Sequence, residues 1–497
     1  MAQLLLGYDV GSSSIKATLM DAGTGKTLVS AGSPDRELEI IAKKAGWAEQ
    51  QPETWWEHVK RATAKIKEKV AFDPADVQAI GISYQMHGLV CVDKNQRVLR
   101  PSIIWCDSRA VQIGQEAARQ IGSAKCLKRL FNLPGNFTAS KLKWVQEYEP
   151  KLYAKIHKIM LPGDYVAMKM TGEIKTTPSG LSEGIMWDFA ADKLAEFVLD
   201  NYDISTDLIA DTVPTFSVQG ELTRAAAAEL GLRAGIKISY RAGDQPNNAL
   251  SLSVLKPGEI AVTAGTSGVV YGVTDQKNYD KKSRGNVFVH VNHTPDKPRY
   301  GVLLCVNGTG ILNSWLKHNF VAGDELDYPQ MNELAAQVPV GSDGLAILPY
   351  GNGAERTLEN HNIGASVHGW NFNIHKKPHF LRAAQEGIVF ALNYGLEIMR
   401  DMGTKLKTVK AGNANMFLSP LFAEAFATIS GATVELYNTD GSQGAARGAG
   451  IGAGIYGKPE DAFIGLEPVR KVPPNKKLAS AYKEACTLWE SYLQRQL

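Results

Sequence analysis

The sequence predicts an α/β protein made of two related domains. Its 497 residues exceed the size at which a single hydrophobic core usually stops growing. Apolar, strand-like runs alternate with longer segments of helical period, which is the order found in layered α/β domains. The pattern that opens the chain also returns near its middle. This return indicates an internal repeat. The alternative is a chance match, because the residue types involved are common.

Two strands joined by a tight turn are expected at the start of the chain. Residues 4–21 read LLLGYDVGSSSIKATLMD, with apolar runs on both sides of a Gly/Ser break. The following AGTGKT resembles a Walker A loop, but Met20 stands where that motif needs its first glycine. Because the strand-like TLVSAG overlaps its end, we expect a second hairpin turn there.

A helix and a buried strand should follow. Residues 51–70 have a helical period, with Pro52 near the start. The apolar residues of this segment fall roughly on one face: Trp55, Trp56, Val59, Ile66 and Val70. The apolar run VQAIGISYQ then indicates a strand.

The middle of the chain repeats the opening. Residues 258–275 read GEIAVTAGTSGVVYGVTD, again an apolar strand, a small polar turn, a β-branched strand and an Asp. Pro246 and Pro257 interrupt the segment before it. We therefore expect one domain at residues 1–245 and a second at residues 246–497.

Both hairpin turns could bind phosphate. A phosphate is held by converging backbone N–H groups that no bulky side chain obstructs. The residues that would provide such groups are Gly11, Ser12, Ser13 and Ser14 in the first turn and Gly265, Thr266 and Ser267 in the second. Ordinary structural turns have the same composition, so the two turns together are a stronger signal than either alone.

Asp9 directly precedes the first turn. A carboxylate beside an anion site is unfavourable unless a cation such as Mg²⁺ lies between them. We therefore interpret Asp9 as a magnesium-associated acid. The alternative is an Asp that caps its own turn.

A third candidate nucleotide segment lies at residues 409–431. A strand enters the loop AGNANM, and a helix is expected after Ser419 and Pro420. Nucleotides often bind α/β proteins at such strand ends, although a plain strand-to-helix connection reads the same way. In the later segment 441–457, glycines at a spacing of four predict a helix whose small-residue face packs closely.

Polar residues follow three further strand-like runs, in QMHGLV, IIWCDSR and AGDQPNN. Sites in open sheets are built at strand ends. His87, Asp107, Asp244 and Gln245 are suited to hydrogen-bonding hydroxyl groups, and Trp105 could form an apolar wall. Taken one at a time, each is better explained as an ordinary structural residue, such as an Asp in a turn or a helix cap.

Composition narrows the class of protein. The net charge of +3 is too small to argue for a nucleic acid or a membrane surface as a partner. The 5 cysteines are scattered without CxxC spacing, which favours reduced thiols. With no signal-peptide pattern and no long apolar run, we expect a cytoplasmic protein.

The motifs in their order resemble the carbohydrate kinases of the FGGY family, and the xylulose kinases among them. The resemblance covers nearly the whole chain and includes YDVGSSSIKA, GWAEQQP, MHG, IIWCDSR, LPGDYVAMKMTGE, AGDQ, TAGTSG, AGNANM and SQGAARGA. It implies two ribonuclease-H-like domains of the actin and hexokinase type, with an active-site cleft between them. The N-terminal domain would carry the sugar site, and the C-terminal domain would carry the adenosine site.

The resemblance also implies roles for individual residues. Asp244 would be the catalytic base, and Asp9 would be the acid associated with Mg²⁺. The sugar contacts would be Met86, His87, Trp105, Asp107, Asp244 and Gln245. The ATP-binding residues would be Gly11, Ser12, Ser13, Ser14, Lys16, Gly265, Thr266, Ser267, Gly412 and Asn413. An ordinary pKa for Asp244 would suffice, because its proton is gained late in a loose transition state.

The expected reaction is transfer of phosphoryl from ATP to D-xylulose, giving D-xylulose 5-phosphate. Leu89 and Val90 follow MHG where Ala and Thr are more familiar in the family, so ribulose, gluconate and other polyols stay open as substrates. Alternatives of another class are a non-kinase ATPase and a sugar-sensing protein of the same fold. A homodimer is also left open.

Overall fold

The computed structural model describes residues 3–321 and 326–497. The described residues form two compact units. Unit 1 draws on Met1–Ser253, Phe288–Tyr300 and Thr439–Leu466, and unit 2 draws on Val254–Val287, Gly301–Asn438 and Glu467–Leu497. The predicted division between residues 245 and 246 falls inside helix α10 (Asp244–Ser251) and stays a prediction. The sequence pattern did not predict that later segments would belong to unit 1.

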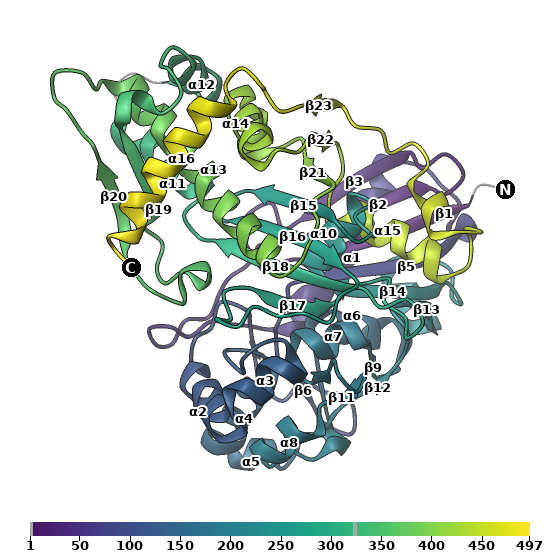
Figure 1. The fold of residues 1–497 in the computed structure, drawn as a ribbon. Helices are drawn as coiled ribbons and strands as arrows, with labels where there is room; N and C mark the ends of the chain where they lie inside the picture. Colours follow the sequence, from purple (N-terminus) through teal and green to yellow (C-terminus); the bar gives the residue numbers. More distant parts are fainter. Residues whose placement is uncertain (1–2, 322–325) are drawn as a thin grey trace. The chain divides into compact units, whose positions relative to one another are not determined.

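Within the described residues, the main sheet of unit 1 has six strands (Figure 1). Their order is β13 (Phe216–Glu221), β14 (Lys237–Gly243), β5 (Val77–Tyr84), β1 (Leu4–Val10), β2 (Ile15–Asp21) and β3 (Thr27–Ser33). Strand β1 pairs antiparallel with β2 and parallel with β5, and β5 pairs parallel with β14. The predicted opening hairpins are confirmed, and AGTGKT lies in the β2–β3 turn.

The second sheet, most of whose residues belong to unit 2, repeats this arrangement. Its described strands are, in order, β17 (Asn286–Val289), β18 (Tyr300–Val306), β16 (Gly268–Thr274), β15 (Glu259–Ala264), β21 (Thr408–Gly412), β22 (Val434–Tyr437) and β23 (Arg470–Val472). Here β15 takes the place of β1: it pairs antiparallel with β16 and parallel with β21, which pairs parallel with β22. The recurrence in the sequence therefore reflects a repeated structural unit.

Helices surround both sheets. Those of unit 1 are α1 (Pro52–Lys69), α2 (Val111–Ile121), α3 (Ser123–Leu130), α4 (Thr138–Tyr148), α5 (Pro150–Tyr153), α6 (Pro162–Thr171), α7 (Pro178–Glu183), α8 (Glu196–Tyr202), α9 (Arg224–Leu230), α10 and α15 (Gly441–Gly452). Those of unit 2 are α11 (Gly310–Trp315), α12 (Tyr328–Ala336), α13 (Lys377–Asp401), α14 (Pro420–Ser430) and α16 (Ala479–Gln494). The predicted helices at residues 51–70, after Ser419 and from residue 441 are all present.

Short two-stranded ladders join the loops around these helices. They pair β4 (Glu49–Gln50) with β7 (Ser102–Ile103), β6 (Val90–Val92) with β8 (Lys158–Met160), β9 (Lys175–Thr176) with β12 (Asp211–Thr212), β10 (Trp187–Asp188) with β11 (Lys193–Leu194), and β19 (Ala346–Tyr350) with β20 (Gly364–His368). No helix among the described residues is both long and apolar enough to span a membrane.

The sheet of unit 1 is buried on both faces because alternate residues of a strand point to opposite sides. Leu4 and Leu6 of β1 join a core that includes α1 and α6, whereas Leu5 packs with Ala446 and Ala449 of α15. Helix α15 approaches the sheet so closely that a Cβ added to Gly81 would lie 2.0 Å from the backbone oxygen of Ala445. The predicted small-residue face of this helix is thus confirmed.

We expect Gly81→Ala to lower the free energy of unfolding by about 1–3 kcal/mol, the usual cost of overpacking a close contact. The added methyl group has backbone in its way, so helix α15 or strand β5 must shift. Gly32→Ala in β3 is the matched control, because its Cβ would lie 3.9 Å from the nearest atom. Chemical denaturation compares the two variants. Equal unfolding midpoints would contradict the close helix–sheet packing.

Candidate active site

Three predicted site segments begin at the carboxyl ends of neighbouring parallel strands in unit 1. In the ladder, Asp9 of β1 is level with Ser83 of β5, and Ser83 is level with Ala242 of β14. The residues that follow these strands therefore meet at one edge of the sheet, where sites of α/β proteins are built. They include the phosphate turn after β1, His87 after β5 and Asp244 after β14.

Asp9 lies between the sheet and the start of helix α15. Ser83 Oγ donates a hydrogen bond to Asp9 Oδ1 at 2.9 Å, and a Cβ on Gly441 would lie 2.4 Å from Oδ2. Burial raises the pKa of Asp9, and the charge of Asp440 adds to that effect; the bond from Ser83 and the charge of Lys16 oppose it. The turn itself closes through a bond from the Gly11 N–H to the Ser14 carbonyl at 3.1 Å.

Asp244 is the first residue of helix α10 and is partly exposed. Its carboxylate accepts hydrogen bonds from the backbone N–H and the side chain of Gln245. Burial, with a further contribution from the charge of Asp9, raises the pKa of Asp244 from its ordinary 3.8 to about 7. The sequence did not indicate this shift, because it does not show that two carboxylates share one edge of the sheet.

The MHG loop lies directly against the start of the Asp244 segment. Met86 is buried, and a Cβ on Gly243 would lie 2.6 Å from Met86 Cγ. Only glycine therefore fits immediately before Asp244 without moving the loop. His87 is partly exposed, and its role and that of Met86 as sugar contacts stay predictions.

The IIWCDSR loop contains two predicted site residues, one exposed and one buried. Trp105 is 53% exposed, and its indole N–H donates to Ser12 Oγ in the phosphate turn at 3.3 Å. Asp107 is fully buried and accepts hydrogen bonds from Ala48 N at 2.6 Å and from Arg109 Nε at 2.9 Å. Its carboxylate is thus paired with groups of the protein, and its role as a sugar contact stays a prediction.

Hydrogen bonds from neighbouring residues hold the first phosphate turn in place. Gln50 Nε2 donates to the Ser12 carbonyl at 2.7 Å. Lys16 is opposite Asp9 in the hairpin register, so the two side chains share a face, and Lys16 is exposed. An exposed cation beside small hydroxyl side chains suits a polyanionic ligand.

Unit 2 presents its predicted nucleotide residues in the same way at its own sheet edge. The turn of Gly265, Thr266 and Ser267 connects β15 to β16. The N–H groups of Gly310 and Ile311 donate to the carbonyls of Gly265 and Thr266 at 2.8 and 3.1 Å, which fixes the turn against helix α11. Gly412 ends the neighbouring strand β21, and the Asn413 N–H donates to the Tyr437 carbonyl at 2.8 Å.

Two family models match this chain in sequence. The N-terminal domain model of the FGGY family of carbohydrate kinases matches residues 4–251, and the C-terminal domain model matches residues 260–455. The chain belongs to the FGGY family of carbohydrate kinases. It is therefore a sugar kinase, and kinases of this family use ATP as a substrate.

Named relatives of this FGGY kinase share nearly its full length. The xylulose kinase of Bacillus subtilis (strain 168) is 29% identical over 463 residues, 91% of this chain and 89% of that protein. The crystal structure of a xyloylose kinase from Brucella ovis has a TM-score of 0.88 at 26% identity, over 99% of both chains. A gluconate kinase from Lactobacillus acidophilus shares the fold, with a TM-score of 0.90 at 22% identity over 100% of this chain and 98% of that one. The predicted fold class, two α/β domains of the actin type, is confirmed.

Three residues beside this site were not predicted from the sequence: Lys141, Glu183 and Asp440. Asp440 caps helix α15 by accepting from the Gln443 N–H at 3.0 Å, and an Asp before a glycine-rich helix is a signal that could have found it. Glu183 follows no strand-like run, and Lys141 lies within helix α4. Their proximity to the site depends on tertiary packing, which local patterns do not show.

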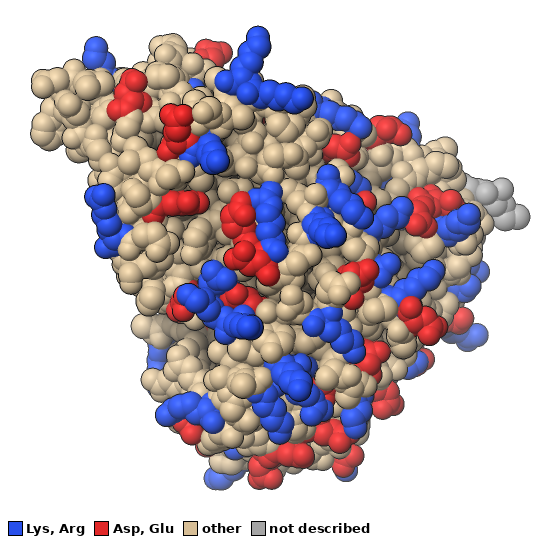
Figure 2. All heavy atoms as spheres, in the orientation of Figure 1, with Lys and Arg blue, Asp and Glu red and all other residues tan. Residues whose placement is uncertain are grey.

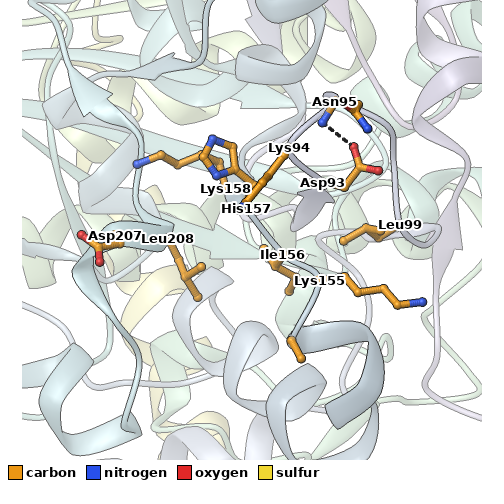
Figure 3. A pocket seen from close by; sticks show the side chains of 11 residues that line it. Asp93, Lys94, Asn95, Leu99, Lys155, Ile156, His157, Lys158, Asp207 and Leu208 are labelled. Carbon is orange, nitrogen blue, oxygen red and sulfur yellow. Dashed lines mark hydrogen bonds between the residues drawn. The ribbon is translucent and has the colours of Figure 1, made fainter.

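A surface cavity of about 650 Å³ lies elsewhere on unit 1 (Figure 3). Its lining includes Asp93, Lys94, His157, Lys158 and Asp207, and none of the predicted site residues lines it. Exposed lysines on loops are common on any surface, so we assign the cavity no role. On the face drawn in Figure 2, basic and acidic side chains are intermixed, in keeping with the net charge of +3.

Proposed function

We propose that this FGGY kinase phosphorylates a ketopentose, most specifically D-xylulose to D-xylulose 5-phosphate, with ATP and Mg²⁺. The observation that carries the proposal is the partly exposed Asp244, held at a sheet edge beside the phosphate turn of Asp9 in a chain of this family. The similarity to xylulose kinases over most of the chain supports the choice of sugar. ATP is present in the cytoplasm, where we propose that the enzyme acts.

The proposed chemistry uses Asp244 as a general base. The sugar hydroxyl oxygen forms a bond to the γ-phosphorus of ATP, and the bond from that phosphorus to the β–γ bridging oxygen breaks, releasing ADP. The hydroxyl proton passes to Asp244, whose pKa near 7 suits a base that works at neutral pH. Gln245 orients the Asp244 carboxylate, and Met86, His87 and Trp105 contact the sugar.

Each unit carries residues that we propose bind ATP. In unit 1, the Gly11–Ser14 turn and the Lys16 ammonium would bind phosphate. In unit 2, the Gly265–Ser267 turn would bind phosphate, while Gly412 and Asn413 would contact the adenosine. Phosphoryl transfer depends mainly on such positioning and on charge neutralisation, because its transition state is loose.

The carboxylates of unit 1 fit a magnesium ion. The charge of Asp440 raises the pKa of Asp9, and the charge of Asp9 raises the pKa of Asp244. This repulsion is what a divalent cation relieves. Mg²⁺ usually keeps several waters and binds through one or two carboxylates plus substrate phosphates, so Asp9 suffices as the acid near the metal. The bound ion would neutralise charge on the β- and γ-phosphates.

Other sugars remain as second candidates, because a likeness to a gluconate kinase and the Leu89–Val90 departure leave the sugar open. The structure makes Leu89 and Val90 fully buried, so they would act on the sugar only through the shape of the loop. Initial rates of ADP release with D-xylulose, L-xylulose, D-ribulose, L-ribulose, gluconate and glycerol test the proposal. The highest kcat/KM should belong to D-xylulose. A higher value for gluconate or glycerol would replace the ketopentose proposal.

We expect kcat/KM for the sugar to rise with pH, with a midpoint near the pKa of about 7 of Asp244, because the base must be ionised. Asp244→Asn should remove this pH dependence, since the variant side chain cannot ionise. A midpoint that stays in place in that variant would belong to another group. The stability of the fold should change with pH in the opposite direction. The folded state binds the proton of Asp244 more tightly than the unfolded state does. The contribution of this group to stability is therefore complete below pH 3.8 and is lost as the pH rises to about 7.

A further inference from the structure

His87 has a backbone conformation that is costly for a residue with a side chain. Its φ of 61° lies in the left-handed region. Such strain persists only where the surroundings hold it, and it gathers at functional sites. The His87 N–H donates to Glu183 Oε2 at 3.2 Å, and the His87 carbonyl accepts from Lys141 Nζ at 2.8 Å. Two buried ionisable side chains thus hold the backbone of the residue that we propose contacts the sugar.

Glu183 connects three parts of the site. It ends helix α7, and its side chain is 1% exposed. Its Oε1 accepts from the Tyr84 hydroxyl at the end of β5 at 2.6 Å, while Oε2 accepts from His87. A Cβ on Gly243, directly before Asp244, would lie 3.2 Å from the same Oε2. Burial raises the pKa of Glu183 well above its ordinary value.

Lys141 connects the MHG loop with the Trp105 loop. It is fully buried on helix α4, and its Nζ donates to the carbonyl of His87 at 2.8 Å and to that of Ile104 at 3.0 Å. Ile104 directly precedes Trp105. Burial lowers the pKa of Lys141 to about 7. Burial of a lysine costs free energy, so an apolar residue would stabilise the core better if packing were the only role of this position. The two carbonyl contacts instead indicate that Lys141 holds the two loops in place.

The ring of His87 is fixed as well as its backbone. Nδ1 lies 2.8 Å from the backbone carbonyl oxygen of Glu183. A carbonyl only accepts, so Nδ1 carries a proton; in a neutral ring Nε2 is then the acceptor nitrogen. The ring also contacts Phe137 edge-on at 4.9 Å and Phe288 at 5.6 Å between centroids. Both the orientation and the tautomer of the ring are therefore determined by its surroundings.

We propose that Glu183 and Lys141 are positioning residues of the sugar site: their side chains hold the backbone of His87 in its left-handed conformation. This conformation brings the His87 ring to the backbone carbonyl of Glu183, which sets the orientation and tautomer of the ring. The proposal rests on the proposed function, because it assumes that His87 contacts the sugar. It assigns neither residue to the chemical step. Loss of either should weaken sugar recognition and leave ATP recognition nearly unchanged.

Steady-state kinetics of four single variants test the proposal: Glu183→Ala, Glu183→Gln, Lys141→Met and Asp188→Ala. We expect Glu183→Ala and Lys141→Met to raise KM for the sugar by up to about 100-fold, the cost of misplacing a contact by about 1 Å. KM for ATP should change little. Glu183→Gln keeps an acceptor oxygen and should recover most of the loss. Asp188→Ala is the control, because it removes a buried acid of unit 1 that pairs with Arg129. In this variant KM for the sugar should not rise more than KM for ATP.

A double-mutant cycle with His87→Ala distinguishes positioning from general destabilisation. If Glu183 and Lys141 act through His87, their effects on sugar KM should nearly vanish in the His87→Ala background. Effects that add in full would overturn the proposal. So would a parallel rise of both KM values in Glu183→Gln, which is isosteric and should fold.

Nitrogen-15 NMR of the histidine rings tests the proposal without turnover. In the free wild-type enzyme, the His87 ring should carry its proton on Nδ1, and in Glu183→Ala and Lys141→Met it should become a mixture of tautomers. An unchanged single tautomer in both variants would overturn the positioning role. If no sugar stimulates ADP release, the proposed function is wrong. The NMR result would still show whether Glu183 and Lys141 hold the His87 ring in one tautomer.

Discussion

Replacing Asp244 with alanine should lower kcat by about 10²–10⁴-fold, the usual contribution of a positioned general base. Binding of sugar and of ATP should change little. The expected result follows from its place at the start of α10, partly exposed at the sheet edge, with a pKa raised to about 7. Measurement of kcat, both KM values and the melting temperature on this one variant separates the base from its alternatives.

Two other outcomes have distinct signatures. If Asp244 only contacts the sugar, KM should rise while kcat holds. If it only caps helix α10, stability should fall by about 0.5–2 kcal/mol with both constants unchanged. Asp73→Ala is the matched control, because Asp73 caps a short helix through a bond from the Ala75 N–H at 2.8 Å. A kcat for Asp244→Ala within about threefold of wild type would exclude the role of base.

Asp9→Asn should weaken turnover chiefly through the metal. The variant keeps an acceptor oxygen for the bond from Ser83, so the fold should be preserved. At limiting Mg²⁺ we expect the rate to fall by about 10²-fold, as when one preorganised electrostatic group is removed. Raising Mg²⁺ should partly restore it, because the lost carboxylate lowers affinity for the ion.

Titration of Mg²⁺ at saturating sugar and ATP provides the measurement. Ser83→Ala is the control, since it removes the bond to Asp9 and keeps the carboxylate. That variant should need only slightly more Mg²⁺ than wild type. A wild-type rate for Asp9→Asn at limiting Mg²⁺ would mean that Asp9 is a turn residue only.

The sequence predicted those parts of the fold that depend on local patterns. The strands, their small polar turns and helix α1 could be read from periodicity and from Gly, Ser and Pro. The site residues at strand ends could also be predicted, because parallel neighbours bring such ends together.

The remainder depends on contacts between distant segments. Arg109 is near Asp107 in the chain, but the bond from Ala48 that completes the buried pairing is not visible in the sequence. The raised pKa of Asp244 depends on burial and on Asp9, and these two residues are far apart in the chain. Glu183 and Lys141 reach the MHG loop from helices α7 and α4, and no motif marks either one.

The central claim, that this enzyme transfers phosphoryl from ATP to the primary hydroxyl of a ketopentose, is tested most directly by the identity of the product. Phosphorus-31 NMR can follow a reaction of the enzyme with ATP, Mg²⁺ and D-xylulose. We predict that the γ-phosphate signal of ATP is replaced by one phosphomonoester coupled to the protons at C5 of the sugar, together with ADP, and that EDTA prevents the change. Release of inorganic phosphate without any sugar phosphate would contradict the claim.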